Sequence, residues 1–246
     1  MTFYQDEFDA DYELITQKLL NQEISIDSRL KLITKELCQM ITASGKTFLI
    51  YLFINENITY DTCFYLKALH LTDNINHKSR WRNTAITLAF KNYNTSDKVL
   101  LEFLKLKPNL DFYTLSNAFM NHSRHGEVLL EILKLKPDLD CYCYNLKSLT
   151  MYAFMYCKNK EVLLELLKQK PNLKIKKDSG ETVFDFCLKF YAKKSEFDFN
   201  VLEKLYNETN KQDKELLNQD NFKTYLKLRN KYKVKPIILF RYQRRS

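Results

Sequence analysis

The chain has 246 residues, of which 45% are hydrophobic and 28% are charged, and its formal net charge is +9. This balance is typical of a folded protein with a large core, and it excludes a chain that is disordered throughout. With only 3 glycines and 4 prolines, the sequence also argues against an all-β protein built on tight turns. The longest apolar run, residues 48–54, is far shorter than the roughly twenty residues that cross a bilayer, so we expect a soluble protein with no transmembrane segment.

Two helices are predicted at the start of the chain. Residues 8–21 carry apolar side chains at helical spacing from Phe8 to Leu19. Residues 26–43 are predicted to form one second helix that begins near Asp27, a good N-cap residue type. The acidic first residues contain no apolar signal core, so we expect no secretory signal.

One phrase then occurs three times. It reads VLLEFLKLKPNL at 99–110, VLLEILKLKPDL at 128–139 and VLLELLKQKPNL at 162–173. The copies begin 29 and then 34 residues apart, and self-similarity at such a period is the signature of a solenoid. The proline near the end of each copy is predicted to stop a helix. Because one helix pair cannot bury its own apolar face, six leucines are predicted to form core contacts between neighbouring repeats: Leu101, Leu104, Leu130, Leu133, Leu164 and Leu167.

The segments between and before these copies also share a phrase. GKTFLIYLF at 45–53, NTAITLAF at 83–90 and DSGETVFDFC at 178–187 resemble the opening of the inner helix of the ankyrin repeat, G-x-T-P-L-H-x-A. The first segment lacks the proline after Thr47 and has Leu52 where the family has alanine. The resemblance implies stacked helix pairs joined by β-turn fingers, with partners bound at the finger tips and inner helices.

The spacing of the sequence supports this resemblance. The first residue of each finger triplet lies ten residues before the Thr or Ser that opens the next inner helix, as from Asn74 to Thr84 and from Asn172 to Thr182. A small residue recurs at one inner-helix position, where it lets two helices approach closely: Ala89, Ala118, Ala153 and Cys187.

We therefore predict an all-α fold, an ankyrin-repeat α-solenoid of about five degenerate helix-pair repeats at residues 44–208. Residues 1–43 are predicted as a helical N-terminal cap and residues 209–246 as a C-terminal capping helix with a basic tail. Almost no strand is expected, and helix pairs are predicted at 83–106, 113–135, 147–169 and 181–206.

One repeat departs from this spacing. Leu110 and Ala118 are eight residues apart, six fewer than the fourteen between the corresponding residues Leu139 and Ala153. The missing residues belong to the finger, because the sequences of both helices survive. Two interpretations remain open. One is harmless loss of loop length, which the general tolerance of loops favours. The other is a notch in the row of fingers that admits a bulky element of a partner.

The sequence offers little for catalysis or metal binding. No nucleophile–base arrangement, glycine-rich phosphate loop or paired-carboxylate motif is visible, so we expect no enzyme activity and no cofactor. His122, His125, Cys141 and Cys143 are zinc-ligand types. The implied fold separates the histidines from the cysteines by the length of a helix, about 13 Å, so no metal site is predicted. The thiols are expected to be reduced and mostly buried, with Cys141 and Cys143 exposed.

The candidate binding residues lie in the predicted fingers, which hold the only tryptophan of the chain. Trp, Tyr and Arg are the residue types that most often dominate binding energy. For Trp81 two interpretations stay open, an exposed binding residue or a ring folded back onto the inner helices. The full set is Arg80, Trp81, Arg82, Tyr142, Tyr144, Lys174, Lys176 and Lys177.

The end of the sequence is strongly basic. Residues 221–246 contain nine Lys and Arg residues and no Asp or Glu, which equals the net charge of the whole chain. A solvated capping helix at about 211–233 with a short basic end accounts for this pattern. The alternative is electrostatic contact with nucleic acid or anionic lipid through the tail residues Lys231, Lys233, Lys235, Arg241, Arg244 and Arg245.

On function, we predict a non-catalytic protein–protein interaction scaffold that acts as a monomer. The alternative is a binder of nucleic acid or anionic membrane through residues 221–246. The Lys-, Asn-, Ile- and Tyr-rich sequence resembles divergent ankyrin proteins of intracellular bacteria or large DNA viruses. That resemblance implies a host-interaction role and a cytoplasmic location, including the cytoplasm of a host cell.

Overall fold

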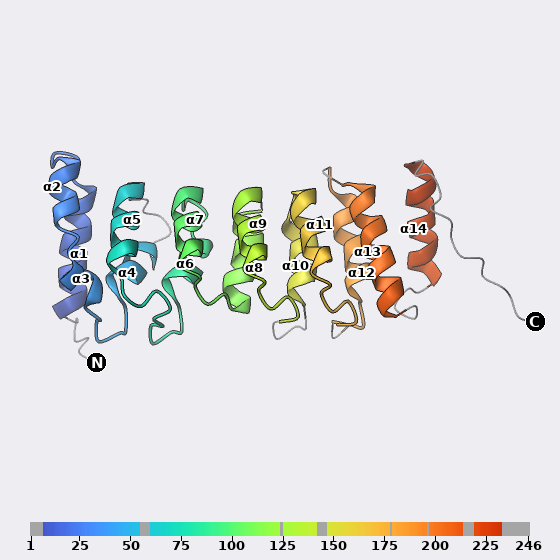
Figure 1. The fold of residues 1–246 in the computed structure, drawn as a ribbon, viewed down its shortest axis with the longest axis horizontal. Coiled ribbons are helices and arrows are strands. Elements are labelled where there is room, and N and C mark those ends of the chain that lie inside the picture. Colours follow the sequence, from blue (N-terminus) through green and yellow to red (C-terminus); the bar gives the residue numbers. More distant parts are fainter. Residues whose placement is uncertain are drawn as a thin grey trace, which may run out of the picture.

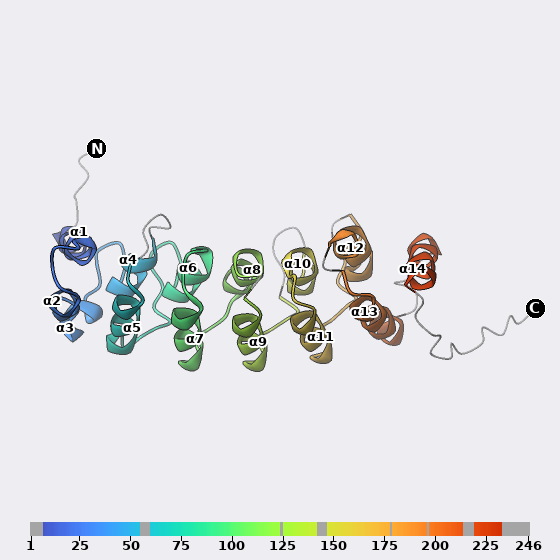
Figure 2. The same ribbon diagram turned by 90° about the horizontal axis from the view of Figure 1, so that it is seen from above.

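The computed structural model describes residues 7–54, 60–123, 125–141, 147–177, 179–195, 197–213 and 219–232. Within them the chain forms an elongated stack of helices in two layers (Figure 1, Figure 2). Two isolated β-bridges, Ile41 with Thr47 and Lys176 with Thr182, are the only β-structure in these ranges. The predicted all-α solenoid is therefore confirmed.

Five helix pairs make up the stack. The inner layer contains α4 (Phe48–Ile54), α6 (Ala85–Lys91), α8 (Phe112–Asn121), α10 (Leu149–Tyr156) and α12 (Val183–Phe190). The outer layer contains α5 (Thr62–Leu71), α7 (Asp97–Lys105), α9 (Gly126–Lys134), α11 (Lys160–Lys168) and α13 (Phe199–Gln212), and the short 3-10 turn η1 (Tyr191–Lys193) follows α12. Each helix packs mainly on the next helix of its own layer, as α6 does on α8 and α7 on α9 (Figure 2). This is the contact pattern of a solenoid.

Additional helices lie at the two ends. The first pair is covered by α1 (Glu7–Leu20), α2 (Ile26–Lys31) and α3 (Lys35–Gln39), and α14 (Gln219–Lys231) packs on α12. The single helix predicted for residues 26–43 is wrong, because Thr34 starts a new helix by accepting a 3.2 Å hydrogen bond from the Leu37 N–H. Ser25, and not Asp27, caps the preceding α2. At the other end α13 continues to Gln212, further than the predicted pair at 181–206.

The inner helices begin where the sequence predicts. The side-chain oxygens of Thr84, Ser148 and Thr182 accept hydrogen bonds of 3.2–3.3 Å from backbone N–H groups in the first turn of α6, α10 and α12. The small residues that follow are all fully buried, as predicted: Ala89, Ala118, Ala153 and Cys187. The capping residues thus fix where each inner helix starts, and the small residues fix how closely it packs on the next.

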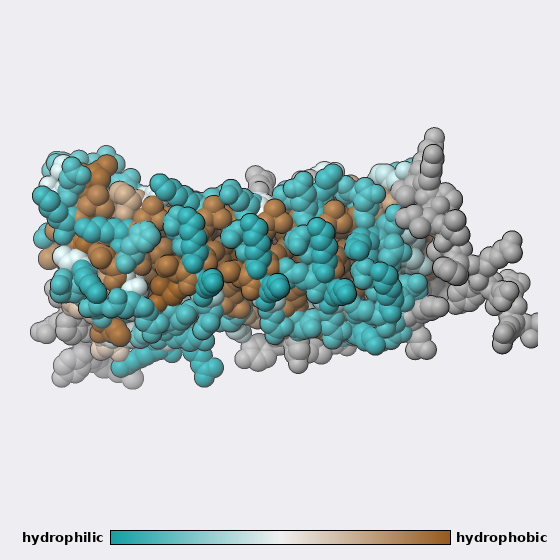
Figure 3. Space-filling model, viewed as in Figure 1, coloured by the Kyte–Doolittle hydropathy of each residue, from teal (hydrophilic) through white to brown (hydrophobic). Residues whose placement is uncertain are grey.

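The outer helices bury the predicted leucines to different depths. In α7 the fully buried side chains follow the helical spacing Val99, Leu100, Phe103 and Leu104, and α9 and α11 repeat this pattern. Leu104, Leu133 and Leu167 are therefore core residues, as predicted. The prediction holds only in part for three leucines on the flank of the helix, which pack against this core but are half-buried: Leu101, Leu130 and Leu164. Figure 3 shows apolar surface between the hydrophilic side chains on this outer side of the stack.

The outer helices end before the prolines that were predicted to stop them. α7, α9 and α11 end at Lys105, Lys134 and Lys168, three residues before each proline. The residue just before each proline is a lysine with a left-handed backbone, at φ 51° for Lys107 and Lys136 and 54° for Lys170. A left-handed residue satisfies the last carbonyl groups of a helix and turns the chain away. The left-handed lysine thus ends each helix, and the proline follows it.

Candidate functional site

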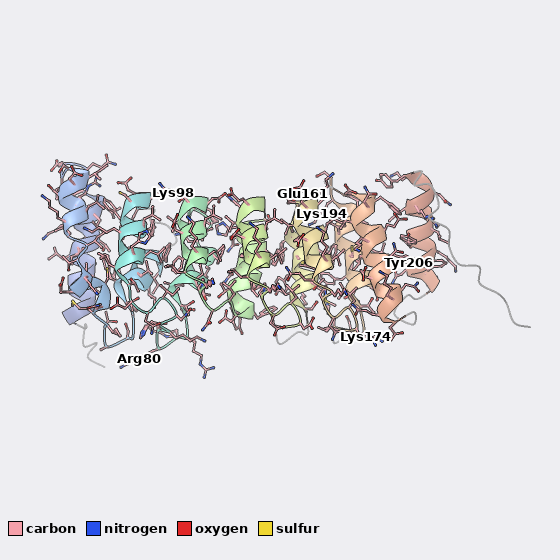
Figure 4. All side chains as sticks on the ribbon, in the orientation of Figure 1. Arg80, Lys98, Glu161, Lys174, Lys194 and Tyr206 are labelled. Carbon is pink, nitrogen blue, oxygen red and sulfur yellow. The ribbon has the colours of Figure 1, made fainter. Side chains whose placement is uncertain are left out.

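The fingers project from one long edge of the stack. Arg80 and Lys174 lie at this edge towards opposite ends of the stack, whereas Lys98 and Glu161 lie at the other edge (Figure 4). The second to fifth fingers are residues 72–84, 106–111, 135–148 and 169–182, and each leads into the first turn of an inner helix. We name these fingers, together with the exposed side chains of the inner helices, the finger surface.

The tip of the second finger is a turn with a fixed backbone. The Ser79 N–H donates to the carbonyl oxygen of Asn83 at 2.9 Å, and the Arg80 N–H donates to the carbonyl oxygen of Ser44, in the preceding loop, at 3.2 Å. Trp81 lies at this tip and is 63% exposed. Of the two interpretations left open by the sequence, the structure therefore shows the exposed ring.

Cations surround this tryptophan. The Lys46 Nζ lies 5.7 Å from the ring centroid of Trp81 and equally far from that of Tyr51, which is within the range of a cation–π contact. Arg80 and Arg82 are both exposed on either side of it. The second finger thus presents an aromatic ring within a positive environment.

The third finger has lost most of its length, as predicted. Its residue Asp111 caps α8. Its carboxylate accepts hydrogen bonds from the backbone N–H (2.9 Å) and the hydroxyl (2.8 Å) of Thr114, so it caps α8. Counted from the equivalent alanine of each inner helix, α8 begins six residues before Ala118, whereas α10 begins four residues before Ala153. The inner helix of this repeat is therefore extended at its N-terminus into the space near the missing finger.

The extension of α8 consists of two aromatic residues, Phe112 and Tyr113. Their ring centroids are 6.0 Å apart, and the Phe112 ring also meets the Tyr152 ring of α10 edge-on at 5.6 Å. Tyr152 in turn lies 5.9 Å from Tyr156. Tyr113 is 56% exposed and the other three rings are half-buried. We name Phe112, Tyr113, Tyr152 and Tyr156 the aromatic patch.

Hydrogen bonds link successive fingers elsewhere in the row. The Asn76 Oδ1 accepts from the Asn109 N–H at 2.7 Å, and the Asp140 Oδ1 accepts from the Asn172 N–H at 2.7 Å. Asp111 is the residue of the third finger that corresponds to Asn76 and Asp140, but it caps α8 instead. Sequence reasoning identified the shortened finger and missed the aromatic patch, because the patch depends on where α8 begins.

In the fifth finger one of the predicted binding lysines forms an ion pair within the protein and two are exposed. The Lys177 Nζ lies 3.0 Å from one carboxylate oxygen of Glu181, and the Lys189 Nζ lies 2.9 Å from the other. Hydrogen bonds from Lys189 and then Lys177 lower the pKa of Glu181 to about 2. Lys174 and Lys176 are exposed. Of the three predicted binding lysines, Lys177 is thus engaged within the protein.

Several predicted binding residues lie outside the described residues. Lys231, at the end of α14, is exposed, with its Nζ 5.4 Å from the ring centroid of Tyr232. The residues outside the described ranges are Tyr142, Tyr144, Lys233, Lys235, Arg241, Arg244 and Arg245.

The zinc-ligand types do not form a site in the part of the chain that the structure describes. His122 is fully buried, and burial followed by the nearby charge of His125 lowers its pKa to about 4. The His125 Nδ1 lies 2.5 Å from the Asp97 Oδ1. Cys141 is half-buried, which corrects its predicted exposure, and burial followed by Asp138 raises its pKa to about 11. Cys143 lies outside the described residues, and among those described no group of three or more His, Cys, Asp and Glu residues is placed to hold a metal ion.

A helix that crosses a bilayer needs about twenty mostly apolar residues. None of the described helices is both long and apolar enough to span a membrane.

Comparison with known proteins rests on structure alone, because no family model and no curated protein matches the sequence. The structure resembles an ankyrin repeat domain from Acinetobacter baumannii, with a TM-score of 0.51, 14% sequence identity, and coverage of 82% of this chain and 94% of that one. It also resembles a chain from the complex of a predatory endopeptidase of Bdellovibrio bacteriovorus with an immunity protein, with a TM-score of 0.50, 17% identity, and coverage of 74% and 92%. At such identities the similarity concerns the fold.

Proposed function

We propose that this chain, which has the ankyrin-repeat fold, is a protein–protein interaction scaffold that binds another protein through the finger surface. Solenoids of this kind offer an extended surface to partners. The observation that carries the proposal is the exposure of two large aromatic side chains on that surface, Trp81 at 63% and Tyr113 at 56%. Aromatic side chains of this kind often dominate the energy of an interface once a partner buries them.

The proposal includes the finer predictions made from the sequence. In it the chain acts as a monomer without catalysis or cofactor, with residues 1–43 and 209–246 as caps of the repeats at 44–208. The proposed role in a host cytoplasm rests on the resemblance of the sequence to ankyrin proteins of intracellular bacteria and large DNA viruses. Binding to nucleic acid or anionic lipid through residues 221–246 is the alternative function.

Site-specific photo-crosslinking tests the proposed surface. A photoreactive phenylalanine analogue would replace Tyr113 in one protein and Tyr93 in another. Tyr93 is a suitable control because it is 63% exposed and lies in the connection between α6 and α7. Lys98, in the first turn of α7, lies at the edge opposite the fingers (Figure 4). We expect a discrete crosslinked protein from host-cell lysate at position 113 and not at position 93. Identical products at both positions, or none at 113, would contradict the proposal.

A further inference from the structure

We propose that the partner contributes an extended acidic segment with a central apolar side chain. The acidic ends of this segment lie on the second and fifth fingers, and its apolar side chain lies on the aromatic patch. This inference rests on the proposed function and specifies the chemistry of the partner.

The first observation is the distribution of charge along the fingers. By sequence, the second finger has three Lys and Arg residues against one carboxylate, and the fifth has four lysines against two carboxylates. The third finger has one lysine and one aspartate, and the fourth has two of each. The net charges are therefore +2, 0, 0 and +2, so the row is positive at both ends and neutral in the middle. An acidic partner is attracted at two separate places.

The exposed cations at the two ends are not neutralised by the described carboxylates of their own fingers. In the second finger Asp73 points to α3, where its Oδ1 lies 3.8 Å from the Lys35 Nζ. In the fifth finger Glu181 is held by Lys177 and Lys189. The exposed cations left to meet a partner are Lys78, Arg80, Arg82, Lys174 and Lys176.

The second observation is the aromatic patch between these ends. The shortened third finger, residues 106–111, leads directly into the two-residue extension of α8, where Tyr113 is 56% exposed. Phe112 holds this extension against Tyr152 of the next repeat, at 5.6 Å between ring centroids. The short finger therefore acts as a notch, the second of the two interpretations of its length. A bulky apolar side chain that enters it buries apolar surface on both molecules.

The geometry of the stack sets the length of the segment. Neighbouring helices pack about 8–10 Å apart, so the three steps from the second repeat to the fifth span about 24–30 Å. An extended chain rises about 3.3 Å per residue, so roughly seven to nine residues cover this distance. The matching segment has acidic residues roughly seven to nine positions apart, with the apolar residue near the middle.

The same charges disfavour a nucleic acid on this surface. A single strand carries a negative phosphate at every nucleotide and needs a groove that is positive along its length. The middle of the row instead contains as many aspartates as lysines, namely Asp111, Asp138 and Asp140 beside Lys107, Lys136 and Lys147. A continuous polyanion meets these carboxylates, whereas a segment that is acidic only at its ends avoids them.

A displayed library of random sixteen-residue peptides, selected on the full chain, tests this inference. We expect enriched peptides to have Asp or Glu at both ends and an aromatic or aliphatic residue between them. Their Kd, measured by fluorescence polarisation, should rise at least tenfold for Tyr113→Ser and for the double variant Arg80→Glu, Lys174→Glu. Matched controls outside the finger surface, Tyr93→Ser and Lys98→Glu, should leave the Kd unchanged, and circular dichroism should show that every variant folds.

The remaining outcomes separate this inference from the proposed function. Apolar peptides without acidic ends that still require Tyr113 would overturn the inferred chemistry and leave the proposed surface intact. Peptides insensitive to all the finger-surface variants, or no enrichment at all, would overturn both. Tighter binding of a twenty-nucleotide single-stranded DNA, with a steep loss of affinity in salt, would overturn the inference in favour of nucleic acid.

Discussion

Lys107, Lys136 and Lys170 share a backbone conformation that side chains disfavour. Their φ angles are 51°, 51° and 54°, in the left-handed region, where the Cβ atom approaches the following carbonyl oxygen at a cost of about 1–2 kcal/mol. Glycine has no Cβ and adopts this conformation freely, but it loses more conformational entropy on folding. The two effects oppose each other, and the strain is the larger.

Replacing Lys136 by glycine is therefore expected to raise the free energy of unfolding by about 0.5–1 kcal/mol. Urea unfolding measures this change. Lys134→Gly is the matched control, since Lys134 is equally exposed but ends α9 in helical conformation, so glycine there should lower the stability. If the two variants change the free energy of unfolding by the same amount in the same direction, Lys136 is not strained in its left-handed conformation.

His122 links stability to pH. In the unfolded chain its pKa is about 6.5, and burial beside His125 lowers the folded pKa to about 4. Between these values the unfolded chain binds a proton that the folded chain does not, so stability falls as the pH falls through this window.

Because of His122, we expect the free energy of unfolding to fall by about 2 kcal/mol when the pH is lowered from 7 to 5. His122→Gln should remove this loss, whatever its effect on stability at pH 7. His70→Gln, at an exposed histidine, should retain the loss. An unchanged pH slope in His122→Gln would show that His122 is not the titrating group.

At the scale of one element, Asp111 decides where α8 begins. The two hydrogen bonds to Thr114 extend the helix to Phe112 and place the aromatic patch. Asp111→Ala is expected to lower the free energy of unfolding by about 1 kcal/mol, and Asp111→Asn by only a few tenths, because asparagine keeps the accepting oxygen. Thermal or urea unfolding of both variants measures this difference. Equal losses in the two variants would mean that the negative charge, and not the cap, matters.

How far the sequence predicts an element depends on how local its signal is. The N-caps Thr84, Ser148 and Thr182 follow from a fixed spacing, and the structure confirms them. The break between α2 and α3 was not predicted from the sequence. The apolar pattern continues through Thr34 and favours one helix, whereas Thr34 in the structure is an N-cap. For Leu101 and the equivalent leucines of α9 and α11, helical spacing alone does not say how deeply each flank of an apolar helix is buried.

The candidate site was also predictable only where its signal is local in the sequence. Sequence reasoning placed Trp81 in a finger, but its exposure depends on the turn that Ser79 and Asn83 close. The six-residue deficit before Ala118 was visible as a spacing. The deficit adds two aromatic residues to the start of α8, but this could be predicted only by knowing that Asp111 caps the helix.

At the scale of the whole molecule, the repeats and the basic tail offer two different modes of binding. In the proposed complex, apolar contacts and hydrogen bonds hold the partner on the finger surface, together with its acidic groups at the two ends. A polyanion on the tail adds close to one unit to the salt dependence of log affinity for each phosphate neutralised. The two modes therefore differ in their response to salt and to truncation.

A chain that ends at Lys235 lacks Arg241, Arg244 and Arg245 and separates these modes. We expect both forms to bind DNA, RNA and anionic vesicles weakly at physiological salt and to bind the protein partner equally well. Titrations of the two forms across a range of salt concentrations measure this. Tight binding of the full chain that falls steeply with salt and is lost on truncation would favour the alternative function.

The most direct measurement of the central claim compares binding and stability in one variant, Trp81→Ala. Trp81 is 63% exposed at the tip of a fixed turn, so its removal should change the free energy of unfolding by no more than about 0.5 kcal/mol. The Kd for the partner captured at position 113 should rise about thirtyfold, which corresponds to about 2 kcal/mol for the loss of an aromatic hot spot. A variant that melts several degrees lower and yet binds the partner normally would contradict the account, because Trp81 would then stabilise the fold and not the complex.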